Sequence, residues 1–491
     1  MTVEIRPFMV VATTQGGGAM NHEGTSGDIL PSRRNVAGAL TLGLSAALFN
    51  TGFRSEVAAA DTAPALMSDL DALRASTLDK KSVALSPHSL VGSRPSLAII
   101  SRFQPGHGWR ASTGSLSNLV VDDTSDYALG VQSLALATQA SGVGGSVDSP
   151  ISATGLNLEG GMVRLLIKVD DWSQINSLRL VAGDNTFDND RNFNLDARET
   201  RTTASYVKDR EWTWVTLNAS AGSKSGTGAT NVTRWRLSAS SKAGGVAVVH
   251  LGAIEAGRVV RTFPNGVVSI CFDDGRRSPY LYAKPKLDAL GWSASAFPII
   301  DRVSGTTSSS YLNATELRQC REYSGWEIGV HANLASEHNA GFDTLTSDEV
   351  EQSILASRQW FYDNDLGPGE GFAWPLGAFN KTVEAAARRL CAYGRLNTSW
   401  SLETWPPGNP MRIRSALNTT EYSKVRTMID QTRAAGGWLC LTFHEVTPTG
   451  TESMAVSVST FGQVLEYISD QGLAVLPMLD VIRSGSTAAP M

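Results

Sequence analysis

The stretch GVVSICFDDG, residues 266–275, decides the fold of the C-terminal half of this chain. Its apolar part is short, rich in β-branched residues and bounded by Gly266 and Gly275, which is typical of a strand buried on both faces. Similar runs follow it along the chain, and helical patterns lie between them. Such alternation predicts a parallel sheet, and we expect it to close into a barrel with its chemistry at the C-terminal ends of the strands.

The predicted strands of this half are short apolar runs at 266–272, 293–299, 326–331, 371–377, 411–415, 438–446 and 473–479. The helical patterns between them lie at about 279–290, 313–324, 347–365, 380–393, 421–435 and 460–471. The third pattern follows Thr346 and has Glu349 in its first turn. This spacing predicts a capping box, in which the two side chains satisfy free amide groups at the helix N-terminus.

Ahead of the barrel, from about Leu97 to Val260, short runs such as MVRLLIKV (162–169) and TRWRLSAS (233–240) alternate apolar and polar residues. Period-two alternation, broken by clusters of Gly, Ser, Asn and Asp, predicts an all-β sandwich of the jelly-roll type. The chain is therefore expected to be multidomain. The predicted parts are an export signal at 1–60, a linker at 61–94, the β-sandwich at 95–260, the barrel at 261–485 and a tail at 486–491.

Composition excludes several classes of protein. The chain has 491 residues, which exceeds one ordinary domain, and 42% of them are hydrophobic, which excludes wholesale disorder. A net charge of −5 and a pI near 5.9 argue against a nucleic-acid partner, because phosphate binding needs a basic surface. The cysteines are too few and too dispersed for a disulfide framework, so we expect buried free thiols at Cys271, Cys320, Cys391 and Cys440.

An export signal is predicted near the N-terminus, where Arg33-Arg34 precedes the mild apolar segment 36–49 and then Ala58-Ala59-Ala60. This order resembles a twin-arginine signal cleaved after residue 60, which implies a periplasmic, cell-surface or extracellular location. The segment is shorter than the roughly 18 residues that cross a bilayer, so no stable membrane span is expected. The alternatives are an amphipathic or buried first helix, and a translation start at Met20.

Ionisable side chains gather at the ends of the predicted strands. Asp273 and Asp274 end the first strand, His331 ends the third, and His444 lies on the strand at 438–446. Taken alone, Asp-Asp-Gly is also a common turn, and a single histidine is often a core residue. Together these groups suit metal-assisted hydrolysis, in which one Asp and histidines hold a divalent cation with a position open for water. The second carboxylate would take a proton from that water, and a separate histidine would protonate the leaving group.

Four motifs resemble those of the polysaccharide deacetylases, carbohydrate esterase family 4 of the NodB-homology type. In order along the chain they are CFDDG (271–275), WEIGVHANLASEH (326–338), FAWPLGAFN (372–380) and LCLTFHE (439–445). The resemblance covers about residues 262–485. It implies a distorted (β/α)7 barrel, a polysaccharide or oligosaccharide substrate, and a divalent metal cofactor, Zn²⁺ first, with Co²⁺, Ni²⁺ or Mn²⁺ as alternatives.

The resemblance also implies a role for individual residues. Asp273 would be the general base, Asp274 and His331 metal ligands, and His444 the general acid. The backbone N–H of Leu376 would help to stabilise the oxyanion.

The sequence departs from the family pattern at the second metal-binding histidine. The family usually has this residue four positions after the first, where this chain has Ala335, and the next histidine is His338. We predict His338 as the third ligand, although seven residues along a straight helix span about 10.5 Å, because a looped segment would shorten that gap. The alternative is a solvated His338, with Asn333, Glu337 or water completing the site.

A further departure is the arginine that pairs with the base in the family, whose place Ala373 takes here. Arg412 and Arg414 are the candidates to replace it, and both could equally be surface charges. The family's Asp-x-x-Asp-Trp motif is not visible, so the apolar wall of the acetyl pocket would come from Trp400 or Trp405, for which core packing is the plainer alternative. The predicted substrate pocket comprises Pro375, Trp400 and Arg414.

These observations predict an exported, metal-dependent deacetylase that removes N- or O-acetyl groups from a glycan. The main alternative is a catalytically silent carbohydrate-binding or surface-attachment protein on a degenerate barrel. A glycosidase is a weaker one, because adjacent aspartates rarely straddle a sugar. The β-sandwich could bind sugars through Trp or Tyr, or serve as a structural or docking domain. The slight acidic excess of the barrel suits a neutral or cationic glycan better than a polyanion.

Overall fold

The computed structural model describes residues 97–114, 116–195, 206–258, 261–304, 309–398, 402–416 and 421–484. The predicted export signal, linker and tail lie outside these ranges, as does Trp400. All described residues belong to one compact unit. Within the described part, every helix is too short or too polar to span a membrane.

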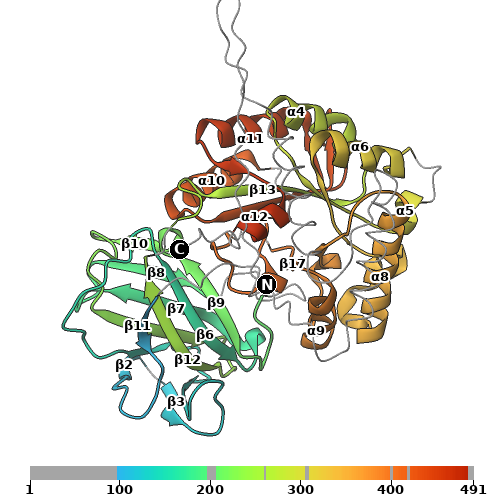
Figure 1. Cartoon of the computed structure of the whole chain (residues 1–491). Coiled ribbons are helices and arrows are strands. Elements are labelled where there is room, and N and C mark those ends of the chain that lie inside the picture. The colour runs from blue at the N-terminus through green and yellow to red at the C-terminus, as the bar shows by residue number, and fades with distance from the viewer. Residues whose placement is uncertain are drawn as a thin grey trace, which may run out of the picture. The chain divides into compact units, whose positions relative to one another are not determined.

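The region from 97 to 258 forms two antiparallel sheets (Figure 1). One has the strand order β3-β4-β12-β6-β9, with β1 also paired to β12, and the other has the order β10-β8-β7-β11-β5-β2. The strands are β1 (Ala98–Ser101), β2 (Arg110–Gly114), β3 (Leu116–Asp123), β4 (Ser133–Thr138), β5 (Gly145–Asp148), β6 (Met162–Val169), β7 (Ile175–Gly183), β8 (Asp190–Asn194), β9 (Thr213–Asn218), β10 (Ser223–Ser225), β11 (Arg234–Ser241) and β12 (Val248–Gly257).

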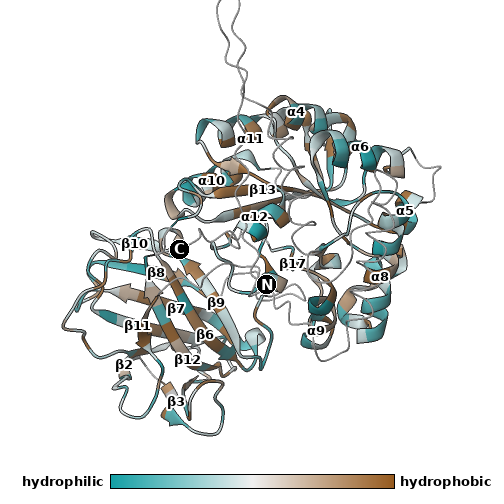
Figure 2. Cartoon of the chain, viewed as in Figure 1, coloured by the Kyte–Doolittle hydropathy of each residue, from teal (hydrophilic) through white to brown (hydrophobic). Residues whose placement is uncertain are grey.

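The core of this region forms because apolar and polar side chains alternate along the strands. In β11 every second side chain is buried, including those of Trp235 and Leu237, whereas Arg234 and Arg236 lie on the other face. Figure 2 shows this mixture of apolar and polar residues along the strands. Trp109 and Trp172 are also buried, so these indole rings serve packing.

The region from 261 to 484 alternates strands and helices. Its strands are β13 (Val267–Asp274), β14 (Ser295–Pro298), β15 (Glu327–Ile328), β16 (Gly371–Ala373), β17 (Tyr393–Arg395), β18 (Trp438–Phe443), β19 (Glu445–Thr447), β20 (Ala455–Ser457) and β21 (Ala474–Val475). Its α-helices are α4 (Lys284–Ala289), α5 (Ile300–Ser304), α6 (Ala314–Ser324), α7 (Ala335–Ala340), α8 (Ser347–Asp363), α9 (Lys381–Leu390), α10 (Tyr422–Ala435), α11 (Val458–Asp470) and α12 (Met478–Ser484). The capping box predicted at Thr346 and Glu349 is present at the start of α8.

Parallel pairing links these strands beyond the main sheet. That sheet has the order β15-β14-β13-β18, with β21 paired to β13, while β16 pairs with β17. Isolated parallel bridges connect the end of β15 to β16, and β17 back to β18 through residues 413–416. The bridges are Val330↔Phe372, Arg395↔Ile413 and Ala416↔Leu441. The pairings therefore run in a circuit through β13, and Figure 1 shows α4, α6, α8 and α11 outside these strands.

Strand β13 lies at the centre of this region and positions the aspartates. All its side chains from Val267 to Asp274 are buried, which explains its uninterrupted apolar sequence. It pairs in parallel with β14 and β18, so the C-terminal ends of all three strands lie at the same edge. A strand-rich region followed by an α/β region agrees with the sequence prediction.

Candidate active site

Asp273 and Asp274 leave β13 in different directions because the backbone turns sharply at its end. Asp274 has φ of 67° and Gly275 has φ of 71°, both in the left-handed region. A Cβ atom at residue 275 would lie 2.6 Å from Cγ1 of Val303, so the close packing of α5 also requires glycine here. The turn leaves Asp273 fully buried and directs Asp274 towards two histidines.

Asp274, His331 and His338 converge on one point. Oδ1 of Asp274 lies 3.6 Å from Nε2 of His331 and 3.3 Å from Nε2 of His338. The two imidazole centroids are 4.8 Å apart, and one potential ligand atom from each of the three residues lies within 4.8 Å of the others. The structure thus brings together the three residues that the sequence predicts as metal ligands.

The donor set has the chemistry of a divalent metal site. Oδ1 of Asp274 is buried and lacks a hydrogen-bond partner among the described residues, which is costly unless a cation completes the site. Nδ1 of His331 lies 2.9 Å from the carbonyl oxygen of Ala373, so as N–H it donates there and leaves Nε2 as the free lone pair. Burial lowers the pKa of His331 to about 4, which keeps the ring neutral near neutral pH. One carboxylate oxygen and two imidazoles are ligands that Zn²⁺ prefers.

His338 reaches this point because the chain after His331 is not a straight helix. The intervening segment is extended at Leu334, and α7 starts only at Ala335. This is the looped arrangement that shortens the seven-residue gap. The Glu337 carboxylate accepts hydrogen bonds from the Leu334 amide and the Ser353 hydroxyl. The Glu337 carboxylate is therefore already engaged in these two hydrogen bonds.

Asp273 is paired with Arg395. One guanidinium nitrogen donates to both carboxylate oxygens, at 2.7 and 2.6 Å, and both residues are fully buried. Burial alone would raise the pKa of Asp273, but the charge of Arg395 and its hydrogen bonds outweigh burial, and the pKa is lowered. Asp273 is consequently held as an ionised carboxylate next to Asp274 at the end of β13.

The expectation that Arg412 or Arg414 pairs with Asp273 is wrong. Arg412 donates to Glu384 and to Glu211, and the buried guanidinium of Arg414 binds Glu403. Both arginines therefore pair with other carboxylates and not with Asp273.

Arg414 is also corrected as a substrate-pocket residue, because it donates to the carbonyl oxygen of Thr216 in β9 as well as to Glu403. The sequence does not point to Arg395, because no strand is predicted at 393–395, where Tyr393-Gly394-Arg395 forms β17. The available signal was a charged residue within an apolar stretch, since a buried arginine needs a partner.

The remaining predicted residues lie around this group. His444 directly follows β18, is buried, and is close enough for its charge to lower the pKa of Asp273. Leu376 adopts φ of 55° in the 3-10 helix Pro375–Gly377, with its side chain exposed and that of Pro375 buried. Trp405 packs against Trp438 with ring centroids 5.7 Å apart, so it belongs to the core.

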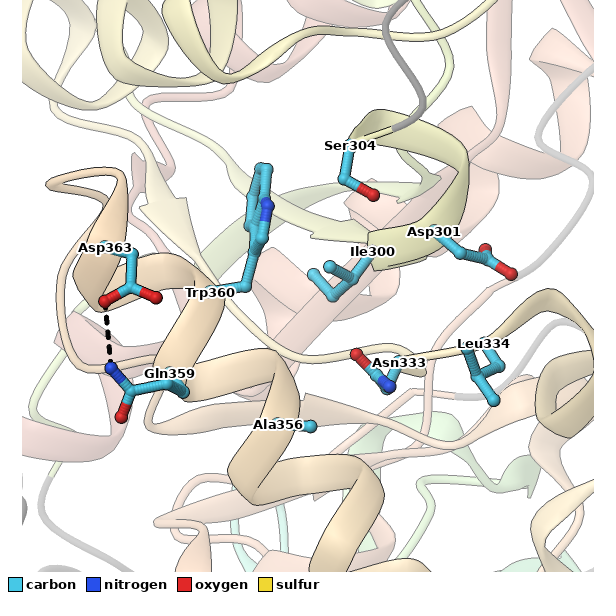
Figure 3. Close-up of a pocket in the computed structure, with 9 residues that line it drawn as sticks. All are labelled: Ile300, Asp301, Ser304, Asn333, Leu334, Ala356, Gln359, Trp360 and Asp363. Atoms are coloured by element: carbon cyan, nitrogen blue, oxygen red, sulfur yellow. Dashed lines mark hydrogen bonds between the residues drawn. The ribbon is translucent and has the colours of Figure 1, made fainter.

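A hollow of about 410 Å³ lies between α5, α8 and the segment that follows His331 (Figure 3). Trp360 and Ile300 face it, and Gln359 donates to Asp363 at its rim. Asn333, two residues beyond His331, is the lining residue nearest in sequence to a predicted ligand. The lining of the hollow includes none of the acidic and imidazole groups of the candidate site.

Comparison with solved structures gives distant similarities. A family 4 acetyl xylan esterase from Clostridium thermocellum, in complex with a cobalt ion, is 17% identical with a TM-score of 0.31, over 44% of this chain and 89% of that chain. A family 4 carbohydrate esterase from Streptomyces lividans in complex with acetate is 18% identical with a TM-score of 0.31, over 43% and 92%. A family 4 pseudoenzyme from Bacillus anthracis is 16% identical with a TM-score of 0.31, over 45% and 66%. Scores this low carry no argument about function.

Comparison of sequences is more specific. No curated protein gives a significant match to the chain. The sequence model of the polysaccharide deacetylase family, in contrast, matches residues 261–393. That match supports a hydrolase that deacetylates carbohydrates. The resemblance inferred from the motifs is thereby confirmed in the C-terminal half, where residues 261–393 match the model of the polysaccharide deacetylase family.

Proposed function

We propose that this protein is an exported, metal-dependent polysaccharide deacetylase that hydrolyses N- or O-acetyl groups of a glycan. The observation that carries the proposal is the buried, unpartnered Oδ1 of Asp274, which faces two imidazole nitrogens beside the ionised Asp273. The circuit of parallel pairings around β13 supports the distorted barrel that this activity implies. Export rests on the twin arginines and the apolar segment of the N-terminal sequence.

Asp274, His331 and His338 would hold the cation, with Zn²⁺ preferred and Co²⁺, Ni²⁺ or Mn²⁺ suited to the same donors. A cation bound there would supply Lewis acidity towards the acetyl carbonyl and lower the pKa of water. The hydrogen bond from Nδ1 of His331 to Ala373 would fix the orientation of that ring.

Asp273 would act as the general base. As water adds to the acetyl carbonyl carbon, the Asp273 carboxylate accepts one of its protons, and Arg395 keeps that carboxylate ionised and fixed in orientation. The N–H of Leu376 would donate to the negatively charged oxygen of the tetrahedral intermediate. When the bond to the sugar nitrogen or oxygen breaks, His444 would protonate the leaving group. Acetate and the deacetylated glycan are the products.

For the β-rich region we propose a docking role in preference to sugar binding. Its β9 contributes contacts to the catalytic region: the Asn218 side chain donates to the carbonyl oxygen of Glu403, and Thr216 accepts from Arg414. Glu211 also pairs with the buried Arg412. Buried charged contacts of this kind orient two surfaces strongly.

The proposal is tested by measuring acetate released from acetylated chitooligosaccharides and acetylated xylan. The wild type should release acetate after reconstitution with Zn²⁺, and Asp273→Asn should lower kcat by about 100-fold or more through loss of the base. His107→Gln, on a distant histidine of the β-rich region, is the matched control. Release of reducing ends would point to a glycosidase. Absence of acetate from every acetylated glycan would favour the catalytically silent alternative.

A further inference from the structure

Two arginines lie over the same aromatic ring at the mouth of the candidate site. The guanidinium carbon of Arg276 is 4.7 Å from the centroid of the Tyr311 ring, and that of Arg302 is 5.6 Å from it. Tyr311 is fixed by a backbone bridge to Arg276, and the next amide, of Leu312, donates to the carbonyl oxygen of Gly275. Two like charges are thus gathered on one rigid support.

Both arginines adjoin the residues assigned to the reaction. Arg276 directly follows the Asp-Asp-Gly turn, and its Nε lies 3.6 Å from Oε1 of Glu445, the residue after His444. Arg302 is on α5, which follows β14, and its Nη1 lies 3.6 Å from Oδ2 of Asp274. A glycan that presents an acetyl group to Asp274 would therefore pass beside both guanidinium groups.

Within the described part of the chain, the guanidinium N–H groups of Arg276 and Arg302 are available to a ligand. Neither guanidinium makes a hydrogen bond there, and the ion-pair contacts of 3.6 Å exceed hydrogen-bond distance. The adjacent Arg277 is different, because its Nε and Nη2 lie 2.8 and 2.7 Å from the Glu316 carboxylate. About a third of the Arg276 side chain and a fifth of the Arg302 side chain remain exposed, so ligand atoms can reach them.

The local charge favours an anion. Two guanidinium groups face Glu445 and Asp274, so these four charges cancel. A divalent cation on Asp274 would engage that carboxylate and leave an excess of positive charge between Arg276 and Arg302. Arginine forks are well matched to the paired oxygens of carboxylates and phosphates.

We propose that the substrate is an acetylated glycan that carries an anionic group, a carboxylate or a phosphate ester, on or next to the acetylated sugar, and that Arg276 and Arg302 bind this group. The inference rests on the proposed deacetylase function and specifies its substrate class. This inference reverses the expectation of a neutral or cationic glycan, which was based on the net charge of the whole predicted barrel. The charges at the site mouth, not the distant surface charges, lie within a Debye length of the substrate.

The kinetic test compares acidic and neutral substrates. Acetylated oligogalacturonate supplies carboxylates, N-acetylglucosamine 6-phosphate supplies a phosphate, and acetylated xylo-oligosaccharide and N-acetylglucosamine are their neutral counterparts. In the double variant Arg276→Gln/Arg302→Gln, kcat/KM for the preferred acidic substrate should fall about 10- to 100-fold, as expected for loss of charged hydrogen bonds. Activity on neutral substrates should change less than about threefold. Arg277→Gln is the matched control and should change neither, and Zn²⁺ content should be equal in all variants.

A binding test separates this inference from the proposed function. Calorimetric titration with oligogalacturonate that lacks acetyl groups, or with glucosamine 6-phosphate, should give a Kd that weakens about tenfold or more in the double variant and with added salt. Of the two probes, the one that binds identifies the anionic group. Equal loss of activity on acidic and neutral substrates, or a Kd unaffected by the double variant, would overturn the inference. If no glycan releases acetate while the arginine-dependent binding persists, the hydrolase proposal fails and the anion site stands.

Discussion

This protein contains two clusters of aspartate and histidine side chains that are similar in composition but differ in the charged groups around them. Asp274, His331 and His338 lie at the end of β13, while Asp126, Asp170 and His250 lie on the β-rich region. In both groups one potential ligand atom from each residue lies within 4.8 Å of the others. By ligand type and spacing alone, either could hold a metal ion.

The difference between them is an internal cation. The ammonium group of Lys168 pairs with the carboxylate of Asp126 and lies 3.2 Å from Oδ1 of Asp170, and the indole N–H of Trp212 donates to Asp126. Among the described residues, Arg302 is the cation that faces Asp274, on its Oδ2 side, so Oδ1 remains open between the two imidazoles. A cluster of ligands thus becomes a candidate metal site where the protein leaves the carboxylate oxygen between the imidazoles without a cation against it.

The largest expected effect of this difference is on metal content. His331→Ala should abolish retention of Zn²⁺ after reconstitution and dialysis and lower kcat by about 100-fold or more, because a buried imidazole ligand is lost. His250→Ala, the matched change in the other group, should leave both quantities within about twofold of wild type. Elemental analysis and acetate release measure the two effects. Equal metal loss in both variants would contradict the comparison.

The next largest expected effect concerns Asp273, the proposed general base. Arg395→Met should lower the free energy of unfolding by about 3–5 kcal/mol, because it leaves the buried carboxylate of Asp273 without its partner. Urea denaturation measures this change. Arg277→Met breaks the pair of a partly exposed arginine with Glu316 and should cost only about 1 kcal/mol. A cost for Arg395→Met no greater than that of the control would mean that Asp273 is not held ionised by this pair.

How far the site follows from sequence depends on how clear the local pattern around each residue is. Asp273 and Asp274 are predictable because β13 is a long apolar run that ends in Asp-Asp-Gly. His331 is predictable because it ends the predicted run 326–331, although the strand formed there, β15, covers only Glu327–Ile328. Arg395 is not predictable, because β17 has only three residues and begins where the helical pattern predicted at 380–393 ends.

Other parts of the site depend on tertiary structure. The convergence of His338 depends on the extended backbone at Leu334, which no local pattern specifies. The gathering of Arg276 and Arg302 on Tyr311 depends on contacts between separate segments. The sandwich-like alternation and the helix caps, in contrast, are local and were predictable.

A smaller effect concerns the pH dependence of stability in the metal-free protein. Burial lowers the pKa of His331 to about 4, against about 6.5 in the unfolded chain. Between these values the unfolded state binds the proton and the folded state does not, so the free energy of unfolding falls as pH drops from about 6.5 to about 4, by roughly 1 kcal/mol per pH unit. Denaturation of chelator-treated protein across this range should show a shallower slope for His331→Gln than for wild type. Identical slopes would contradict the assignment of His331 as a buried neutral ring.

The smallest expected effect is also the sharpest test of the comparison, because it attempts to convert one group into the other. Lys168→Met removes the internal cation from Asp126 and Asp170 and leaves two carboxylates beside His250, whose ring nitrogens lack hydrogen-bond partners among the described residues. The variant should bind one more Zn²⁺ per chain than wild type, weakly, as measured by calorimetric titration. Lys168→Met/His250→Ala should lose the additional ion. If Lys168→Met gains no ion, an uncompensated charge is insufficient, and ligand geometry rather than the internal cation distinguishes the two groups.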